Sequence, residues 1–303
     1  MSVRQAGRKR SAWPLTAYLA ALAVFTAYVL LDAFVIARRY SAAAPDAFPQ
    51  TGENAQLRDE PVITENGYSD GLVSVEISSM RAYDSTVYVA DIRMADVYHL
   101  KTALAENTYG RNVTQRVAEM AQAHQAILAV NGDYYGARKS GYVVRNGVLY
   151  RENAQSASQE DLCIWPDGTM TIIREGEISA QALVEAGVLQ VFSFGPSLLL
   201  EGEITVGESQ EVGKAMISNP RTAIAMIEPL HYLFVVAEGR TEESEGLSLY
   251  QLAKFLQTLG AQLAYNLDGG GSSTLVFLDE VINYPTTNGK YQERAVSDIV
   301  YIQ

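Results

Sequence analysis

The sequence has little of the chemistry on which many enzymes rely. Cys163 is the only cysteine among 303 residues, which excludes an internal disulfide and a cysteine zinc site. The three histidines, His99, His124 and His231, lie far apart, which argues against a histidine-rich metal site and a Ser-His-Asp triad. A GxxxxGK(S/T) segment is missing, which argues against a nucleoside triphosphatase. The second glycine of a G-x-S-x-G elbow is missing around Ser272, which argues against a serine hydrolase of that type.

Basic residues are scarce beyond the N-terminus. Residues 1–40 contain six Lys or Arg and one acid, a net charge of +5, whereas the whole chain has −12. The rest of the chain therefore has −17. Nucleic-acid binding needs a basic surface that displaces counterions from phosphates. We therefore expect no nucleic-acid partner.

A long apolar run near the N-terminus predicts a membrane anchor. Residues 14–36 are interrupted only by Thr16, Thr26 and Asp32, and about 20 apolar residues span a bilayer core. Four basic residues precede the run and two follow it, which orients the N-terminus toward the cytoplasm. A cleaved signal peptide is the alternative, although its apolar region is usually shorter, at about 7–15 residues.

These features divide the chain into four predicted parts. They are a cytoplasmic basic tail (1–13), a transmembrane anchor (14–37), a linker (38–71) and the main domain (72–303). The linker is predicted from its lack of periodicity and its many turn-forming residues. In this arrangement the main domain lies outside the cytoplasm on a single-pass cell-membrane anchor.

The main domain is predicted to be α+β, with a mixed β-sheet and packed helices in one soluble domain. Residues 72–77 and 87–92 alternate apolar and polar side chains, as half-buried strands do. Asn-Gly at 146–147 and Asp-Gly at 167–168 predict hairpin turns. Helices are expected over residues 112–126, 181–188 and 249–259.

Two of these helices have recognisable start signals. Asn112 with Gln115, and Ser248 with Gln251, have the spacing of capping boxes. Gly260 is a typical residue to end the last helix. The two helices should therefore begin at these positions.

Two helix–strand units share one plan, since each ends in a loop that contains Asn, Asp and Gly. The first loop is at residues 131–133 (Asn-Gly-Asp) and the second at 266–269 (Asn-Leu-Asp-Gly). Ligands commonly gather beyond strand ends in such sheets. We therefore expect the two loops to converge on one cleft.

The most distinctive segment is residues 266–273, Asn-Leu-Asp-Gly-Gly-Gly-Ser-Ser, which lies between two predicted strands. Three consecutive glycines leave the backbone bare, so that a ligand can approach its amides closely. A flexible hairpin turn is the alternative, because Asp-Gly favours turns. A turn needs only one or two glycines, so we predict a functional loop.

Charged residues cluster at predicted strand ends. The candidates are the carboxylates of Asp133, Glu238 and Asp268 and the guanidinium groups of Arg221, Arg240 and Arg294. Glycoside hydrolysis generally uses two carboxylates around an oxocarbenium-like transition state. Arginines and backbone amides can stabilise the charge that develops on a phosphate leaving group. The set fits glycosidic cleavage next to a phosphate.

Some of these residues also have a purely structural explanation. Asp133 can belong to a polar turn beside core tyrosines. Arg221 can pair with a structural carboxylate as well as with a bound anion. Arg294 can pair with Asp298 in the final strand. The sequence leaves these alternatives open.

Six segments, in the right order, resemble the phosphodiester glycosidase family. They are Asn-Gly-Asp-Tyr-Tyr at 131–135, Phe-Gly-Pro at 194–196, Pro-Arg-Thr-Ala-Ile at 220–224, Glu-Gly-Arg at 238–240, the loop at 266–273 and Arg-Ala-Val at 294–296. The resemblance covers about residues 72–303 and is dense after Ile127. Glu238 stands where the family usually has Asp, and Asp133 where it often has Gly.

The resemblance implies hydrolysis of an α-linked sugar, such as N-acetylglucosamine, from a phosphodiester or a related cell-surface glycan. Together with the predicted anchor, it indicates a membrane-anchored extracytoplasmic hydrolase. A bacterial cell envelope and exopolysaccharide chemistry fit this expectation. Asp268 is the first choice for acid, base or nucleophile, with Glu238 or Asp133 as its partner. The expected substrate-binding residues are Asn131, Tyr134, Arg221, Thr222, Arg240, Asn266, Gly269, Gly270, Gly271, Ser272 and Ser273. No cofactor is required, although a divalent cation near Asp268 is compatible with hard oxygen ligands.

Two other functions fit the same residues. A non-catalytic protein that binds glycans during exopolysaccharide assembly or export would use the same cleft without cleavage. A scaffold in an envelope complex would not need the glycine loop. Three candidate carboxylates favour the enzyme, because binding alone rarely needs so many.

Overall fold

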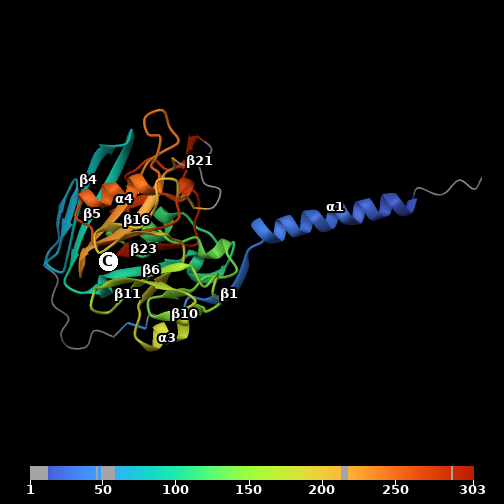
Figure 1. Cartoon of the computed structure of the whole chain (residues 1–303), viewed down its shortest axis with the longest axis horizontal. Helices are drawn as coiled ribbons and strands as arrows, with labels where there is room; N and C mark the ends of the chain where they lie inside the picture. The colour runs from blue at the N-terminus through green and yellow to red at the C-terminus, as the bar shows by residue number, and fades with distance from the viewer. Residues whose placement is uncertain (1–12, 46, 49–58, 213–217, 288) are drawn as a thin grey trace, which may run out of the picture.

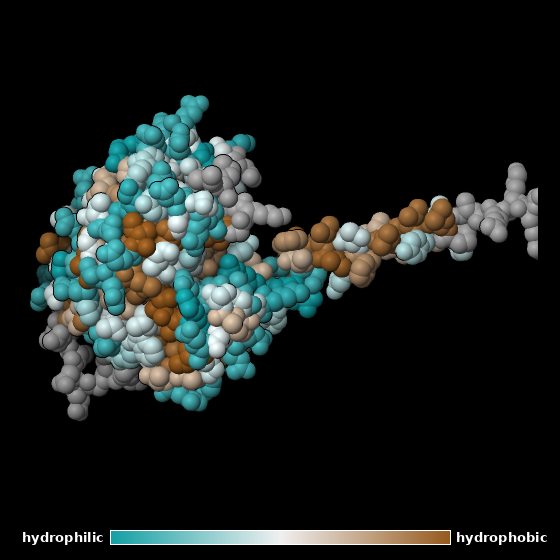
Figure 2. Space-filling model, in the orientation of Figure 1, coloured by the Kyte–Doolittle hydropathy of each residue, from teal (hydrophilic) through white to brown (hydrophobic). Residues whose placement is uncertain are grey.

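One long helix stands apart from a body built mainly of strands (Figure 1). The computed structural model describes residues 13–45, 47–48, 59–212, 218–287 and 289–303. The long helix, α1, covers Trp13–Phe34, and apolar side chains dominate its surface (Figure 2). Residues Leu15–Phe34 are long and apolar enough to cross a membrane, a property that anchors share with signal sequences.

The largest sheet has nine strands in the order β15-β14-β18-β16-β17-β5-β4-β3-β2. In that order the strands cover Glu203–Ile204, Ser197–Leu200, Leu263–Asn266, Arg221–Glu228, His231–Ala237, Ser85–Met94, Val73–Ala82, Gly67–Ser69 and Val62–Thr64. Strand β17 is buried along its whole length. Because side chains alternate between the two faces of a strand, Phe234 enters the central core and Val235 enters the core beneath helix α4 (Leu249–Thr258).

Two five-stranded sheets complete the body. One has the order β20-β19-β8-β23-β6, with bounds Glu280–Val281, Leu275–Phe277, Leu128–Asn131, Asp298–Ile302 and Leu100–Leu104. The other has the order β10-β9-β13-β11-β12, with bounds Val148–Arg151, Val143–Arg145, Gln190–Phe192, Glu160–Ile164 and Met170–Arg174. Ile92, Leu128 and Leu162, one from each of the three sheets, meet in the central core.

The body is mostly strands with few helices, and it confirms the sheet-based part of the predicted α+β fold. Every strand pairing among the described residues is antiparallel, whereas the mixed sheet that we expected would also contain parallel pairs. The smaller helices are α2 (Val117–Ala123) and α3 (Ala180–Glu185). Both predicted hairpins are present, as β9–β10 and β11–β12.

Helix α4 begins where the sequence predicts. Ser248 accepts a hydrogen bond from the backbone N–H of Gln251, whose side chain accepts one from the backbone N–H of Ser248. These reciprocal bonds satisfy donors that would otherwise lack partners at the helix start. Helix α4 packs against β14, β15 and β18, behind the strand that leads into the glycine loop.

The helix predicted at residues 112–126 is shorter than expected, and its predicted capping box is absent. Asn112 has a left-handed backbone, and Gln115 forms a β-bridge with Val296. The side chain of Gln115 accepts a hydrogen bond from the backbone N–H of Glu106 instead of capping a helix. The long-range bridge therefore overrides the local signal, and Arg116 becomes the N-cap residue.

Part of the predicted linker belongs to the body. Strand β1 (Arg38–Ala42) pairs with β7 (Thr108–Arg111), and β2 and β3 extend the nine-stranded sheet at β4. The folded part therefore begins before Leu72. Residues 1–12 of the predicted basic tail and residues 49–58 of the predicted linker lie outside the described residues. A final strand pair, β21 (Thr286–Thr287) with β22 (Lys290–Tyr291), lies near the glycine loop.

Candidate functional site

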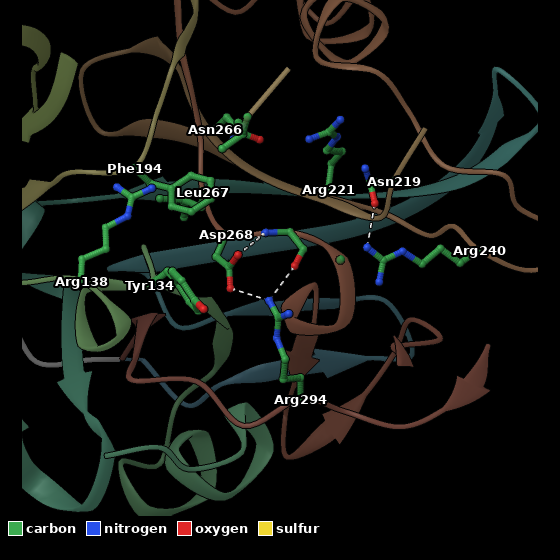
Figure 3. Close-up of a pocket in the computed structure, with 13 residues that line it drawn as sticks. Tyr134, Arg138, Phe194, Asn219, Arg221, Arg240, Asn266, Leu267, Asp268 and Arg294 are labelled. Atoms are coloured by element: carbon green, nitrogen blue, oxygen red, sulfur yellow. Dashed lines mark hydrogen bonds and ion pairs between the residues drawn. The ribbon is translucent and has the colours of Figure 1, made fainter. Parts of the chain in front are cut away.

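The glycine-rich loop follows β18 directly and contains a short 3-10 helix, η4 (Gly270–Ser272). Asp268 lies before this helix. Its Oδ1 accepts a hydrogen bond from the N–H of Gly269 at 3.0 Å, and its Oδ2 accepts one from Ser272 Oγ at 2.6 Å. Arg294 Nη2 donates to the same Oδ2 at 2.8 Å (Figure 3). Three donors therefore fix the orientation of the Asp268 carboxylate.

The three glycines are required by the packing of this loop. A Cβ atom on Gly269 would lie 2.7 Å from the carbonyl oxygen of Pro220, and one on Gly271 would lie 2.4 Å from Thr287 Oγ1. Gly270 has a φ of +65°, which side chains disfavour. The loop can approach its neighbours this closely only because it has no side chains here.

The two Asn-and-Asp loops converge, as the sequence predicts. Asn131 Nδ2 donates to the backbone oxygen of Asp268 at 2.7 Å, and the N–H of Asp268 donates to the backbone oxygen of Gly132 at 3.3 Å. Thr222 Oγ1 donates to Asn131 Oδ1 at 2.8 Å. Asn131 and Thr222 are both buried, so these side chains join the two loops instead of facing open space.

Asp268 faces a cavity of about 400 Å³. Figure 3 shows Tyr134 and Arg294 beside the carboxylate. The lining residues are Tyr134, Arg138, Phe194, Val212, Asn219, Arg221, Arg240, Asn266, Leu267, Asp268, Gly269, Gly270 and Arg294. Of the predicted site residues, this cavity therefore brings together Tyr134, Arg221, Arg240, Asn266, Asp268, Gly269 and Gly270.

Two arginines face the cavity without an acidic partner. Arg240 Nη2 donates to Asn219 Oδ1 at 2.7 Å. Arg138 Nη1 donates to the backbone oxygen of Ser193 at 2.8 Å, and its guanidinium lies 4.9 Å from the ring centre of Phe194. Within the described residues, no carboxylate lies at ion-pair distance from either arginine. Their positive charge is therefore available to an anionic ligand.

Arg221 has the structural partner that the sequence left open. Its Nη2 lies 2.5 Å from Glu211 Oε2, and its Nε donates to the backbone oxygen of Leu247 at 2.8 Å. The side chain is only 4% exposed. Arg221 thus contributes to the cavity wall while its charge is balanced by a carboxylate.

Burial and charge act in opposite directions on the pKa of Asp268. Burial raises the pKa of this carboxyl above its usual value of 3.8, and this effect exceeds the opposing ones. The positive charge of Arg294 and hydrogen bonds from Ser272 and Gly269 lower the same pKa. A raised pKa is common where a carboxyl takes part in proton transfer.

Asp133 lies outside the cavity, in a buried ion network. Its Oδ1 is 2.9 Å from Arg145 Nη2, and Arg145 Nε donates to Asp298 Oδ2 at 2.8 Å. The Asp133 carboxylate also accepts hydrogen bonds from the N–H groups of Tyr135 and Ser193. Asp133 therefore connects strands and does not line the cavity with Asp268.

Glu238 is also outside the cavity wall. Its Oε1 accepts a hydrogen bond from the N–H of Tyr284 at 2.6 Å, and its Oε2 accepts one from Ser244 Oγ at 3.4 Å. Burial raises its pKa, while the bonds from Tyr284 and Ser244 lower it. The predicted second carboxylate is thus occupied in holding two neighbouring loops.

Asn266 presents an acceptor that has no hydrogen-bond partner among the described residues. Its Nδ2 donates to the backbone oxygen of Gly195 at 2.9 Å. Its Oδ1 is buried and receives no hydrogen bond from the described residues. Because buried acceptors are nearly always paired, this atom is suited to an N–H or O–H group of a ligand. Ser273 Oγ is likewise buried and unpaired within the described residues, although Ser273 does not line the cavity.

Sequence reasoning missed several residues of the site. Arg138, Phe194 and Asn219 line the cavity but were not predicted. Phe194 belongs to the Phe-Gly-Pro segment, which the sequence offered only as part of the family resemblance. Arg138 follows η3 (Tyr135–Ala137), where nothing in the local sequence marks it. Arg294 does not pair with Asp298, the alternative that the sequence left open, because Arg294 binds Asp268 and Asp298 binds Arg145.

The residues at the cavity are a poor match for a metal centre. Among the described residues, no three His, Cys, Asp or Glu side chains gather as metal ligands would. Asp268, the only acid in the cavity wall, already contacts Arg294 and Ser272. A hard cation normally needs several oxygen ligands, and this arrangement supplies one engaged carboxylate.

The fold and site define a family. The chain belongs to the phosphodiester glycosidase family, whose model matches residues 124–303. The matched segment contains the converging loops, Asp268 and all four arginines of the cavity.

Two curated relatives are similar to this chain over part of their length. The chain is 28% identical over 187 residues to N-acetylglucosamine-1-phosphodiester alpha-N-acetylglucosaminidase of Homo sapiens, which covers 56% of this chain and 35% of that protein. It is 27% identical over 200 residues to the SPbeta prophage-derived protein YomE of Bacillus subtilis (strain 168), which covers 64% of this chain and 30% of that protein. The chain thus spans about a third of the length of these curated relatives.

A solved structure supports the fold. The zebrafish N-acetylglucosamine-1-phosphodiester alpha-N-acetylglucosaminidase catalytic domain, auto-inhibited by its pro-peptide, matches with a TM-score of 0.60 and 22% identity. The match covers 76% of this chain and 82% of that chain. A putative exported protein from Burkholderia pseudomallei matches with a TM-score of 0.53 and 15% identity, over 72% of this chain and 74% of that one. At these identities the likeness shows the fold alone.

Proposed function

We propose that the chain is a membrane-anchored extracytoplasmic hydrolase that cleaves an α-linked sugar, such as N-acetylglucosamine, from a phosphodiester. The observation that supports this most is the placement of one oriented carboxylate, Asp268, in a cavity with two arginines that lack acidic partners. The carboxylate suits the anomeric carbon and the arginines suit the phosphate. The family membership supports the same reaction class.

The proposed reaction breaks the bond between the anomeric carbon and the phosphate oxygen. A phosphate monoester leaves as a weak base, so it needs little protonation. Positive charge from Arg240 and Arg138 stabilises the charge that develops on its oxygens. A second carboxylate, which most glycosidases use as an acid, is then unnecessary, and this agrees with the positions of Asp133 and Glu238 outside the cavity wall.

Asp268 acts in this proposal as the base that activates water or as the nucleophile at the anomeric carbon. Both roles require its ionised form. Arg294 and Ser272 supply positive charge and a hydrogen bond that oppose the effect of burial on its pKa. Asn266 Oδ1, which is unpaired within the described residues, is available to a donor group of the sugar.

The proposed domain arrangement follows from α1. The helix at Trp13–Phe34 serves as a signal anchor with the N-terminus in the cytoplasm, and the body from β1 onward is the catalytic domain. The basic residues on either side of the helix in the sequence support this orientation. The substrate is then a glycan phosphodiester outside the cytoplasm.

Hydrolysis in water enriched in oxygen-18 tests the reaction directly. The full chain is incubated with the methyl phosphodiester of α-N-acetylglucosamine 1-phosphate. Both products are analysed by mass spectrometry. Cleavage at the anomeric carbon puts the heavy oxygen in the sugar. Heavy oxygen in the phosphate would identify a phosphodiesterase instead, and saturable binding without any product would favour the glycan-binding function.

A further inference from the structure

A second cavity meets the first one at Asp268 and Tyr134. It has a volume of about 320 Å³, and both residues line both cavities. One side of the second cavity is formed by Phe34 and Val35, at the end of α1. The candidate catalytic carboxylate therefore belongs to the walls of both cavities, one of which reaches the end of the proposed membrane anchor.

The end of α1 is held firmly against the body. Arg111 Nη2 lies 3.1 Å from Asp32 Oδ2, and Asn112 Nδ2 donates to the backbone oxygen of Ile36 at 3.1 Å. Immediately afterwards β1 pairs with β7, so the chain enters the body as a strand. These contacts hold the end of α1 at the point where Figure 1 shows the helix leaving the body. Phe34 and Val35, which line the second cavity, lie at this end.

The length of α1 places this cavity at the membrane surface. Its 22 residues extend about 33 Å at 1.5 Å per residue, close to the roughly 30 Å of a bilayer core. Phe34 is 77% exposed and Val35 is 65% exposed, so the apolar surface continues to the edge of the body. A helix that spans the bilayer therefore brings the mouth of the second cavity to the boundary between hydrocarbon and headgroups.

The two cavities differ in charge. Arg138, Arg221, Arg240 and Arg294 all line the first cavity. Among the described residues, no Lys or Arg lines the second, whose wall includes the apolar side chains of Phe34, Val35, Ala137, Ala295 and Val296. An anionic headgroup fits the first cavity, and an uncharged chain fits the second.

We infer that the substrate is a lipid-linked sugar phosphodiester in the membrane that α1 spans, and that the second cavity receives the first part of its alkyl chain. This inference rests on the proposed function and on α1 as the anchor. Water supplies an oxygen to the anomeric carbon and gives up one proton to the solvent, while the bond from that carbon to the phosphate oxygen breaks. The free sugar leaves, and the lipid stays in the membrane as a phosphate monoester that retains the bonding electrons.

The test compares two esters on the full chain in phosphatidylcholine vesicles. The probes are the decyl and methyl phosphodiesters of α-N-acetylglucosamine 1-phosphate, and the readout is the ratio of their kcat/KM values. The variant Ala137→Glu puts a charge at the second cavity. Ala123→Glu, at an exposed position of helix α2, is the matched control. Both variants meet the same amount of membrane-bound ester, so partition into vesicles cancels.

With kcat/KM referred to the ester dissolved in water, the inference predicts that wild type and Ala123→Glu prefer the decyl ester by about tenfold or more, because several methylenes leave water for the second cavity. Ala137→Glu should lose most of this preference, and its thermal unfolding shows whether it is folded. If Ala137→Glu is unfolded, Val35→Ser makes the same test at an exposed position. An unchanged preference in the folded variant, or none in wild type, would overturn the inference while leaving the proposed function intact. Failure to cleave either ester would overturn both.

Discussion

Two acid–arginine groups in this protein have nearly the same geometry and very different surroundings. Arg294 lies 2.8 Å from Asp268, while Arg145 lies 2.9 Å from Asp133 and 2.8 Å from Asp298. The Arg294 side chain is 42% exposed, whereas that of Arg145 is 2% exposed. Distance alone therefore does not separate a reactive carboxylate from a structural one.

The surroundings explain the difference. Arg145 in β9 binds the acid that follows β8 and the acid that begins β23, so it joins the two five-stranded sheets. Asp268 instead faces a cavity that is also lined by Arg138 and Arg240, whose charge is available to an anionic ligand. We interpret the buried group as a structural connection and the exposed group as the chemical centre. The following predictions test this distinction.

The largest expected effect is from Asp268→Asn. It should lower kcat by about 10²–10⁴-fold, the usual contribution of a general base or acid. The amide oxygen can keep only one of the bonds from Ser272 and Gly269, but the neutral amide also removes the cost of burying an ionised carboxylate, so the melting temperature should change little. Steady-state sugar release and thermal unfolding measure the two quantities, and an active, folded variant would contradict the assignment.

Arg145→Met should mainly affect stability. It leaves two buried carboxylates without their counter-charge, which typically costs about 3–5 kcal/mol of unfolding free energy. Urea unfolding of variant and wild type measures this loss. Arg294→Met is the matched control at the exposed pair and should cost less stability while reducing activity. The reverse pattern would mean that the roles of the two groups were exchanged.

The acid side of the pH–rate profile should reflect Asp268. Since burial raises its folded-state pKa above 3.8, the carboxylate becomes protonated at a higher pH than a free Asp. Activity that needs the ionised form is then lost as the pH falls through this raised pKa, by about tenfold per pH unit below it. A profile of kcat/KM with an acid limb at or below 3.8 would contradict this prediction.

Arg240→Ala should weaken substrate binding, because Arg240 has no acidic partner among the described residues. The expected rise in KM is about tenfold, as befits one charge-assisted hydrogen bond of roughly 1.5–3 kcal/mol. Arg93→Ala removes an arginine that is 59% exposed and paired with Asp91, and it is the matched control. Equal KM values for the two variants would exclude Arg240 from the binding site.

The smallest effect is expected from Glu238→Gln. Glu238 accepts hydrogen bonds from Tyr284 and Ser244 and does not line the cavity. The amide oxygen retains one of these bonds, so the loss of stability should be about 1 kcal/mol, with kcat close to wild type. A large fall in kcat at unchanged stability would restore Glu238 as the second catalytic carboxylate.

The sequence predicts best what is local. The capping box of α4 and the Asn-Gly hairpin turn are set by residues a few positions apart, and both are present. The convergence of the two loops was predictable because both follow buried strands. The failures involve distant partners. Gln115, which was predicted to cap a helix together with Asn112, forms a β-bridge with Val296 instead.

The acid–arginine pairs show the same limit. Asp298 lies only four positions after Arg294 in the sequence, but Arg145, which is 153 positions away from Asp298, binds it in the fold. Arg294 turns instead toward the glycine loop. Local reasoning identified both charged residues of the exposed pair, but only the fold could pair them.

The most direct test of this account is the rate of sugar release by Asp268→Asn beside that by Asp133→Asn, each per folded molecule. Urea unfolding gives the folded fraction, and a sugar-1-phosphodiester is the substrate. The account predicts that Asp133→Asn is less stable but nearly as active as wild type when folded, whereas Asp268→Asn is stable and almost inactive. A folded Asp133→Asn that is as inactive as Asp268→Asn would contradict the division between structural and catalytic carboxylates.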